Sequence, residues 1–159
     1  MGPLQDALFE VPDPGHLARV AGRLMVSLVL GGLLGYERER AGKAAGLRTH
    51  ILVALGATLF VLGPIEAGMA VADLSRVIQG IVAGIGFLGA GAILKLVQHE
   101  RVEGLTTAAN IWFTAAIGTA VGSGHLWLPI LGTTMALVVL VLLGYVERRW
   151  ASRGPEGTS

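Results

Sequence analysis

The sequence predicts an all-α, polytopic transmembrane helical bundle of about five spans. Hydrophobic residues make up 53% of the 159 residues and charged residues only 14%, with a mean hydropathy of +0.67. A soluble domain usually carries about 25% charged residues. The chain therefore has too few polar side chains to cover a water-exposed surface. Apolar stretches also recur near the length of about 20 residues that a helix needs to cross a bilayer.

The apolar stretches locate the spans at residues 17–36, 49–65, 77–97, 105–121 and 126–146. We expect residues 1–16 to form an extracytoplasmic segment, residues 17–146 a single transmembrane domain and residues 147–159 a cytoplasmic tail. The first residues include Asp6, Glu10 and Asp13 and have no basic region, so we expect no cleavable signal peptide. The absence of cysteine excludes disulfides and thiolate chemistry.

Basic residues gather in one set of connecting segments, which holds Arg38, Arg40, Lys43, Arg48, Lys95, Arg101, Arg148, Arg149 and Arg153. The opposite set holds only Arg19, Arg23 and Arg76. Since cytoplasmic loops carry the excess of Lys and Arg, this bias predicts an N-terminus outside and a C-terminus in the cytoplasm. No dense basic tract of the kind that binds nucleic acid is present.

The stretch GIGFLG at residues 84–89 matches the glycine spacing of a dinucleotide-binding turn. That fingerprint needs a strand before it and a turn within it, whereas this stretch lies inside one continuous apolar run. Small residues about four apart instead let helices approach closely in lipid. We therefore predict helix packing through Gly31, Gly35, Gly80, Gly84, Gly86, Gly89, Gly91, Gly118 and Gly122.

The first span carries a stripe of polar or small side chains at every fourth position: Arg19, Arg23, Ser27, Gly31 and Gly35. Such a stripe is expected to face the bundle interior. For the two arginines, an alternative is that they extend to the outer interface, because both lie within two turns of the helix start.

A second stripe in the fourth span comprises Thr107, Asn110, Thr114, Gly118 and Gly122. The Asn110 amide needs hydrogen-bond partners where water is excluded. A helix–helix hydrogen bond and a functional role are both consistent with this position.

Charged and hydroxyl side chains gather where the spans meet the predicted cytoplasmic side: Glu37, Arg38, Glu39, Arg40, Arg48, Thr49, Thr106 and Thr107. Two similar segments, GLRT at 46–49 and GLTT at 104–107, each precede a span, and we expect their threonines to act as N-caps. A pair between Glu37 and Arg40 is the structural alternative to a functional role for the charged residues. Glu37 and Glu39 are weak candidates for metal ligands.

Three ordered blocks are similar to the membrane domain of the MgtC/SapB family: GGLLGYERERAGKAAGLRTHILVALGATLF, GIVAGIGFLGAGAIL and VEGLTTAANIWFTAAIGTAVGSG. The resemblance implies a multi-pass protein of the bacterial inner membrane, associated with magnesium homeostasis or adaptation to low magnesium and, in pathogens, with survival inside host cells. It implies either a Mg²⁺ transporter or a regulator of another membrane complex, such as the ATP synthase or a transporter. It also implies a functionally sensitive residue at Thr106. We expect a short form without the family's C-terminal cytoplasmic domain.

Between these functions, the sequence favours a regulator over a Mg²⁺ transporter or channel. Mg²⁺ prefers oxygen ligands that usually include one or two carboxylates, and no Asp or Glu lies in the middle of a predicted span. We expect no cofactor, although the chain could bind Mg²⁺, and partners that comprise the lipid bilayer and a membrane protein. A homodimer would use the remaining glycine faces. We expect no enzyme, because the sequence shows no nucleophile–base pair and no metal-ligand spacing, and its histidines, His16, His50, His99 and His125, are scattered among interfaces.

Overall fold

The computed structural model describes residues 13–94 and 104–151. These ranges form five α-helices and one short 3-10 helix and contain no strand. In chain order the elements are α2 (Pro14–Arg40), α3 (Leu47–Glu66), η1 (Val71–Asp73), α4 (Leu74–Leu94), α5 (Leu105–Gly122) and α6 (Trp127–Ala151). The predicted all-helical fold class is confirmed.

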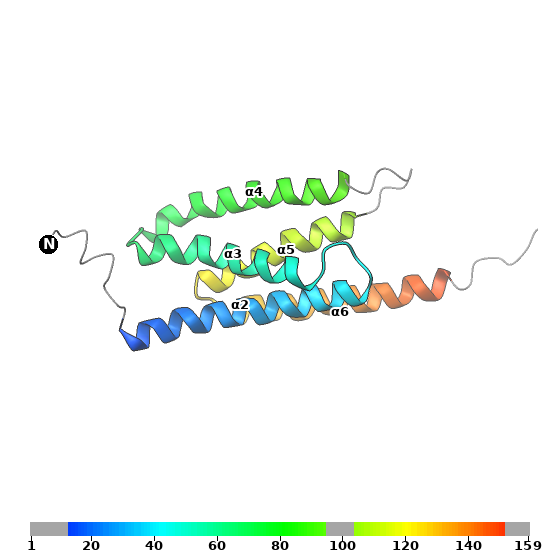
Figure 1. The fold of residues 1–159 in the computed structure, drawn as a ribbon, viewed down its shortest axis with the longest axis horizontal. Helices are drawn as coiled ribbons and strands as arrows, with labels where there is room; N and C mark the ends of the chain where they lie inside the picture. Colours follow the sequence, from blue (N-terminus) through cyan, green and yellow to red (C-terminus); the bar gives the residue numbers. More distant parts are fainter. Residues whose placement is uncertain (1–12, 95–103, 152–159) are drawn as a thin grey trace, which may run out of the picture.

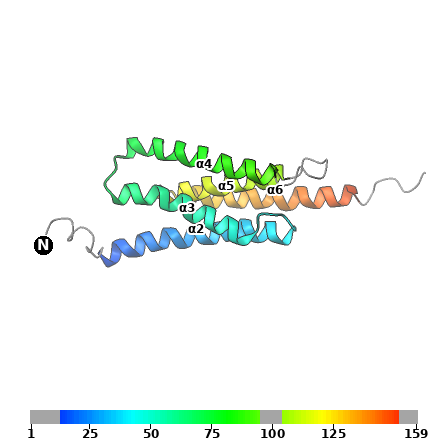
Figure 2. The same ribbon diagram turned by 45° about the horizontal axis from the view of Figure 1, so that its top comes forward.

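Successive helices run in opposite directions, so one end of the molecule gathers the last turns of α2, α4 and α6 and the first turns of α3 and α5 (Figure 1). The same order is visible after a rotation of 45° (Figure 2). We call this end the basic end, because it holds Arg38, Arg40, Lys43, Arg48 and Arg149. The opposite end holds the first turn of α2 and the η1 turn.

Four of the helices described are long and apolar enough to cross a membrane: α2, α3, α4 with η1, and α6. The remaining helix, α5, is 18 residues long and contacts all four of the other α-helices. Half of its residues are buried. As α5 is enclosed by its neighbours, it can carry polar residues that a lipid-facing helix could not.

Helices α2, α3 and α5 form the closely packed centre, and four glycines make this packing possible. A Cβ atom built at Gly31 of α2 would lie 2.8 Å from the Ala54 Cβ atom, and one at Gly35 would lie 2.7 Å from the Leu47 Cα atom. On α5, a Cβ at Gly118 would run into the carbonyl oxygen of Ala54, and one at Gly122 would lie 2.8 Å from the Val61 Cβ atom. These glycines bring the backbones together in the way that small residues do in lipid.

The glycines of α4, which were predicted to pack against another helix, make no close backbone contact. Gly80, Gly84, Gly86 and Gly91 have open space where a Cβ atom would stand, and Gly89 makes only an ordinary contact with Ala108. Within the described part of this chain, they bring no second helix close. The reason is that α4 packs mainly on α5 and diverges from α3.

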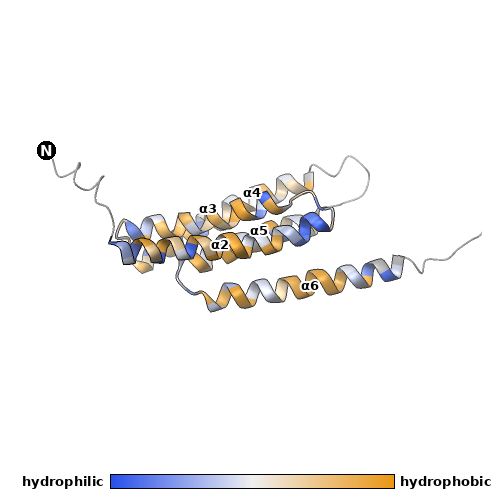
Figure 3. Ribbon diagram, turned by 60° about the horizontal axis from the view of Figure 1, so that its bottom comes forward, coloured by the Kyte–Doolittle hydropathy of each residue, from blue (hydrophilic) through white to orange (hydrophobic). Residues whose placement is uncertain are grey.

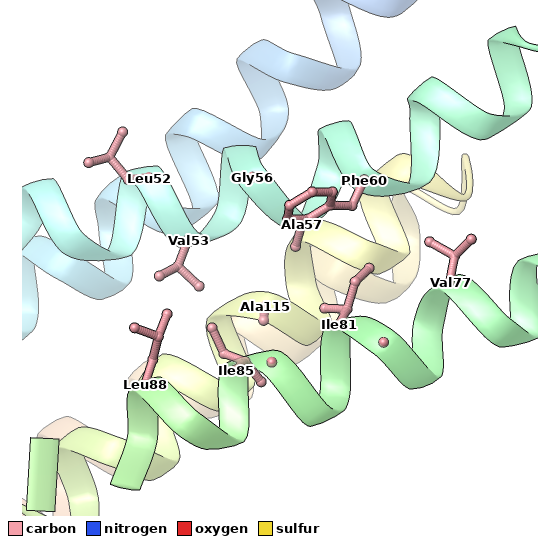
Figure 4. Close-up of a pocket in the computed structure, with 12 residues that line it drawn as sticks. Leu52, Val53, Gly56, Ala57, Phe60, Val77, Ile81, Ile85, Leu88 and Ala115 are labelled. Atoms are coloured by element: carbon pink, nitrogen blue, oxygen red, sulfur yellow. The ribbon is translucent and has the colours of Figure 1, made fainter. Parts of the chain in front are cut away.

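An apolar cleft of about 580 Å³ separates α3 from α4. Figure 4 shows Val53 of α3 facing Ile85 and Leu88 of α4 across this space. Gly56, Gly80 and Gly84 also line it. The outer face of α6 is likewise apolar along most of its length, as Figure 3 shows, and α6 lies to one side of the other helices in that view.

Candidate functional site

The candidate site is a polar cleft of about 390 Å³ at the basic end, between α2, the start of α5 and α6. Its polar lining comes from Glu37, Arg38, Lys43, Thr106 and Glu147, and α6 contributes an apolar wall. Two carboxylates and two cationic side chains therefore share one cleft. The structure thus brings together Glu37, Arg38 and Thr106 from the charged and hydroxyl residues singled out in the sequence.

Arg38 is the most buried charged side chain of this cleft. Its side chain is 5% exposed, and its Nε donates to Oε2 of Glu37, whose side chain is 15% exposed. The pair between Glu37 and Arg40, which was the structural alternative to a functional role, does not occur, because Arg40 lies on the exposed side of the helix end. A buried guanidinium needs a partner to offset the loss of water. The Glu37–Arg38 pair meets that need and leaves Lys43 and Glu147 as the other charges of the cleft.

Glu39 has a structural role at the start of α3. Its Oε2 accepts a hydrogen bond from the backbone N–H of Leu47 at 2.8 Å, which satisfies one of the unpaired amides of a helix N-terminus. The loop reaches this position through Gly42, whose φ of +68° is in the region that favours glycine. Glu39 thus fixes the turn between α2 and α3.

The predicted threonine N-caps are wrong. α3 begins at Leu47 with Gly46 at the cap position, and α5 begins at Leu105 with Gly104, whose φ is +95°. Thr49, Thr106 and Thr107 therefore lie inside the first helical turns, where the backbone has already become helical. Arg48 and Thr49 are exposed and do not line the cleft.

The polar stripe of α5 is buried, as its spacing predicts. Thr107, Asn110 and Thr114 are at most 5% exposed and follow α5 from its first turn toward the middle of the bundle. The Thr114 hydroxyl donates to the backbone carbonyl of Asn110 at 2.7 Å, but the Asn110 Nδ2 atom is buried without a hydrogen-bond partner. The structure thus leaves a donor of Asn110 unpaired, where a helix–helix hydrogen bond was one alternative.

His50 is a buried residue that the sequence analysis assigned to an interface. It is 0% exposed, and its Nδ1 lies 2.9 Å from the carbonyl oxygen of Gly46. Since a carbonyl only accepts, Nδ1 carries the proton in this arrangement. Nε2 is buried without a partner. His50 became buried because Gly31 and Gly35 let α2 approach this turn of α3.

The middle of the bundle is closed around Thr58. Its Oγ1 atom lies 2.8 Å from Ser27 Oγ, 2.9 Å from the Ala54 carbonyl and 2.9 Å from the Gly118 carbonyl. Both hydroxyl side chains are 0% exposed. One threonine thereby connects α2, α3 and α5. An isolated threonine in an apolar span is the only sequence signal for this position, and its partners lie 31 and 60 residues away.

At the opposite end of the molecule, Arg23 and Arg19 differ in their contacts. The Arg23 Nη1 atom donates to the carbonyl oxygen of Gly122 at 3.3 Å, at the last turn of α5, where a cation complements the helix dipole. Arg19 is exposed. A second link at this end, between His16 Nε2 and Glu66 Oε2 at 2.5 Å, joins α2 to the end of α3. Of the two arginines, Arg23 alone has a described hydrogen bond to another helix.

A metal site is not assembled by the carboxylates described. Glu37 is paired with Arg38, and Glu39 accepts from the α3 backbone. No group of three or more His, Asp or Glu side chains suited to a metal ion occurs among the residues that the structure describes. Glu147, which the sequence analysis did not single out, lines the same cleft as Glu37. With side chains of both charges and a hydroxyl in its lining, the cleft can bind a partner surface that carries both charges or hydrogen-bonding groups.

Comparison with known proteins shows the family. The model of the MgtC family matches residues 24–149, which include the α2–α3 turn, the α5 stripe and the cleft. The chain belongs to the MgtC family. MgtC of Brucella abortus is 43% identical over 129 residues, which cover 80% of this chain and 52% of that protein.

Two further relatives agree with this membership. SrpB of Synechococcus elongatus is 46% identical over 129 residues, covering 74% of this chain and 71% of SrpB. The Escherichia coli K12 protein named "Putative magnesium transporter YhiD" is 44% identical over 128 residues, covering 74% of this chain and 57% of YhiD. The chain thus spans little more than half of YhiD and of the Brucella MgtC. No solved structure matches the chain. Family membership and the four apolar helices together make this a multi-pass membrane protein.

Proposed function

We propose that the chain is a bacterial inner-membrane protein that acts in magnesium homeostasis or low-magnesium adaptation by regulating a partner membrane complex. The link to magnesium is supported by MgtC-family membership and by the name of YhiD. In this proposal the basic end faces the cytoplasm, in line with the positive-inside rule. Residues 17–146 act as one transmembrane unit between the short terminal segments.

The observation that carries the proposal is the contrast between the middle of the bundle and its basic end. The middle is filled by the Thr58 hydrogen bonds and by backbone contacts at Gly118 and Gly122. The polar cleft lies at the end, with Glu37 neutralised by Arg38 and with Lys43 and Glu147 at its wall. Balanced charges in an open cleft suit a protein contact, where they set orientation and specificity.

A Mg²⁺ transporter is the second candidate. The buried oxygens of Thr107, Asn110 and Thr114 favour it, since they follow one face of α5, whose first turn lines the cleft through Thr106. Two observations weigh against it. This face of α5 contains no carboxylate, which protein sites for Mg²⁺ usually supply, and Thr58 and Gly118 close the bundle at its inner end.

Site-specific photo-cross-linking in cells grown at low magnesium tests the regulator. A cross-linking residue at Leu143, on the cleft wall, should capture one defined membrane protein, whose activity should change when Lys43→Gln is introduced. Met135, on the same helix and similarly exposed (63% against 56% for Leu143) but outside the cleft lining, is the matched control. Equal capture at Leu143 and Met135, or an unchanged partner activity in Lys43→Gln, would contradict the proposal. An ATP synthase subunit or a transporter is the kind of partner that the family resemblance implies.

A further inference from the structure

A second groove at the basic end lies between α2 and α6 and shares Glu37 and Ala41 with the polar cleft. Its volume is about 880 Å³. Leu33, Leu137 and Val141 form its apolar part, and Tyr36, Tyr145, Arg40 and Arg149 form the rest, together with Glu37 and Ala41. We call it the α2/α6 groove.

The lining of the α2/α6 groove changes from apolar to basic along both helices in the same direction. On α6, the residues Leu137, Val141, Tyr145 and Arg149 recur every four positions and share one face. On α2, Leu33 is followed by Tyr36 and Arg40. Because α2 and α6 both end at the basic end, the two gradients coincide. Leu137 and Arg149 are separated by roughly 18 Å of helix.

This gradient falls at the edge of the membrane. The apolar candidate span of α6 ends at Glu147, so Tyr145 lies at its border and Arg149 just beyond it. The two tyrosines are 60% and 59% exposed. Tyrosine is enriched at the level of lipid headgroups, where its ring is in the apolar region and its hydroxyl in the polar one. A bilayer lipid would therefore meet the groove with its headgroup at the arginines.

The charges of the groove select an anionic headgroup. Glu37 is paired with Arg38, and the other charged residues of the lining, Arg40 and Arg149, are both cationic. Arg149 is held beside Tyr145, with its guanidinium carbon 5.8 Å from the ring centroid and its Nη1 atom 3.4 Å from the hydroxyl. Guanidinium groups bind phosphate with matched geometry.

We propose that the α2/α6 groove binds an anionic phospholipid of the bilayer. Its phosphate lies between Arg40 and Arg149, and one acyl chain lies along Leu33, Leu137 and Val141. Such a lipid would lie in the groove between α2 and α6. The arginines, the tyrosines and the apolar residues Leu33, Leu137 and Val141 of the groove do not line the polar cleft, so this proposal does not depend on the regulatory one.

Lipid binding to the full chain in detergent tests this site. Native mass spectrometry and thermal melting are followed during titration with phosphatidylglycerol and with phosphatidylcholine of the same acyl chains. Phosphatidylglycerol should bind and raise the melting temperature more than phosphatidylcholine does. The double variant Arg40→Gln/Arg149→Gln should bind phosphatidylglycerol about tenfold more weakly or worse. The matched double variant Arg19→Gln/Arg48→Gln, which removes two exposed arginines outside the groove, should bind it like the wild type.

A steric pair keeps the test decisive if the arginine variants fold poorly. Val141→Trp fills the groove and should reduce phosphatidylglycerol binding, whereas Val138→Trp, on an exposed position outside the lining, should not. Glycerol phosphate in solution should give no shift, since it lacks the acyl chain. Equal binding of phosphatidylglycerol and phosphatidylcholine would overturn the proposal. So would an equal loss of phosphatidylglycerol binding in both double variants. A Val141→Trp variant that disrupts a dimer but still binds the lipid would also overturn it, because the groove would then be a contact between two copies of the chain.

Discussion

Thr58 of α3 and Gly118 of α5 meet in the middle of the bundle, where the Thr58 hydroxyl lies 2.9 Å from the Gly118 carbonyl oxygen. The contact exists because residue 118 has no side chain: a Cβ atom there would run into the Ala54 carbonyl and lie 3.0 Å from the Ala57 Cβ atom. Close backbone approach and a buried hydroxyl are therefore two parts of one arrangement. A substitution at Gly118 tests the close approach, and a substitution at Thr58 tests the hydroxyl.

Gly118→Ala should destabilise the protein by roughly 1–3 kcal/mol, because α3 must move away to admit the methyl group. Gly84→Ala is the matched control, since its Cβ would stand in open space and alanine favours the helix by about 1 kcal/mol. Unfolding in detergent, titrated with a denaturing surfactant, measures both. A loss of stability in Gly84→Ala equal to that in Gly118→Ala would show that the two faces do not differ.

Thr58→Val should lower the free energy of unfolding by about 0.5–1.5 kcal/mol, the range for one net hydrogen bond. The hydroxyl of Ser27 then loses its partner on α3. A double-mutant cycle with Ser27→Ala measures the coupling energy between the two side chains. Additive changes in the free energy of unfolding would argue against their contact. Thr134→Val is the control, because the Thr134 hydroxyl is exposed and donates only within its own helix, to Ile130.

Glu37→Gln should cost up to roughly 3–5 kcal/mol, because it leaves the buried Arg38 guanidinium without its carboxylate. The double variant Glu37→Gln/Arg38→Met removes both charges and should recover much of that loss. Arg40→Gln, at the exposed neighbouring position, should stay within about 0.5 kcal/mol of the wild type. If the double variant is less stable than Glu37→Gln alone, the unpaired charge of the buried Arg38 guanidinium is not the cause of the lost stability.

Glu39→Ala should cost about 1 kcal/mol, as other lost N-caps do, because the Leu47 N–H loses its acceptor. Glu39→Gln retains an acceptor oxygen and should cost less. Hydrogen exchange at the first turn of α3 provides the local measurement. Unchanged exchange at Leu47 in Glu39→Ala would contradict the capping role.

Much of the core could be predicted from residue spacing alone. The stripes at Ser27, Gly31 and Gly35 and at Thr107, Asn110 and Thr114 are buried, because side chains three or four positions apart share a helix face whatever the tertiary fold.

The remaining contacts depend on how the helices are placed. The Glu39–Leu47 cap spans eight residues and the His16–Glu66 link spans 50, so no local pattern indicates them. For the same reason, spacing could not distinguish the packed Gly118 from the open Gly84, or show that Glu147 reaches the cleft beside Glu37.

The central claim, a bundle that is closed in the middle and has a polar cleft only at its basic end among the described residues, is tested most directly by magnesium flux. Purified protein is placed in liposomes that contain a magnesium-sensitive dye, and a gradient is imposed. The account predicts the same rate as in empty liposomes, with no change in Asn110→Leu or in Glu37→Gln. Uptake above that of empty liposomes, lost in Asn110→Leu and retained in the control Thr134→Val, would contradict it and favour the transporter.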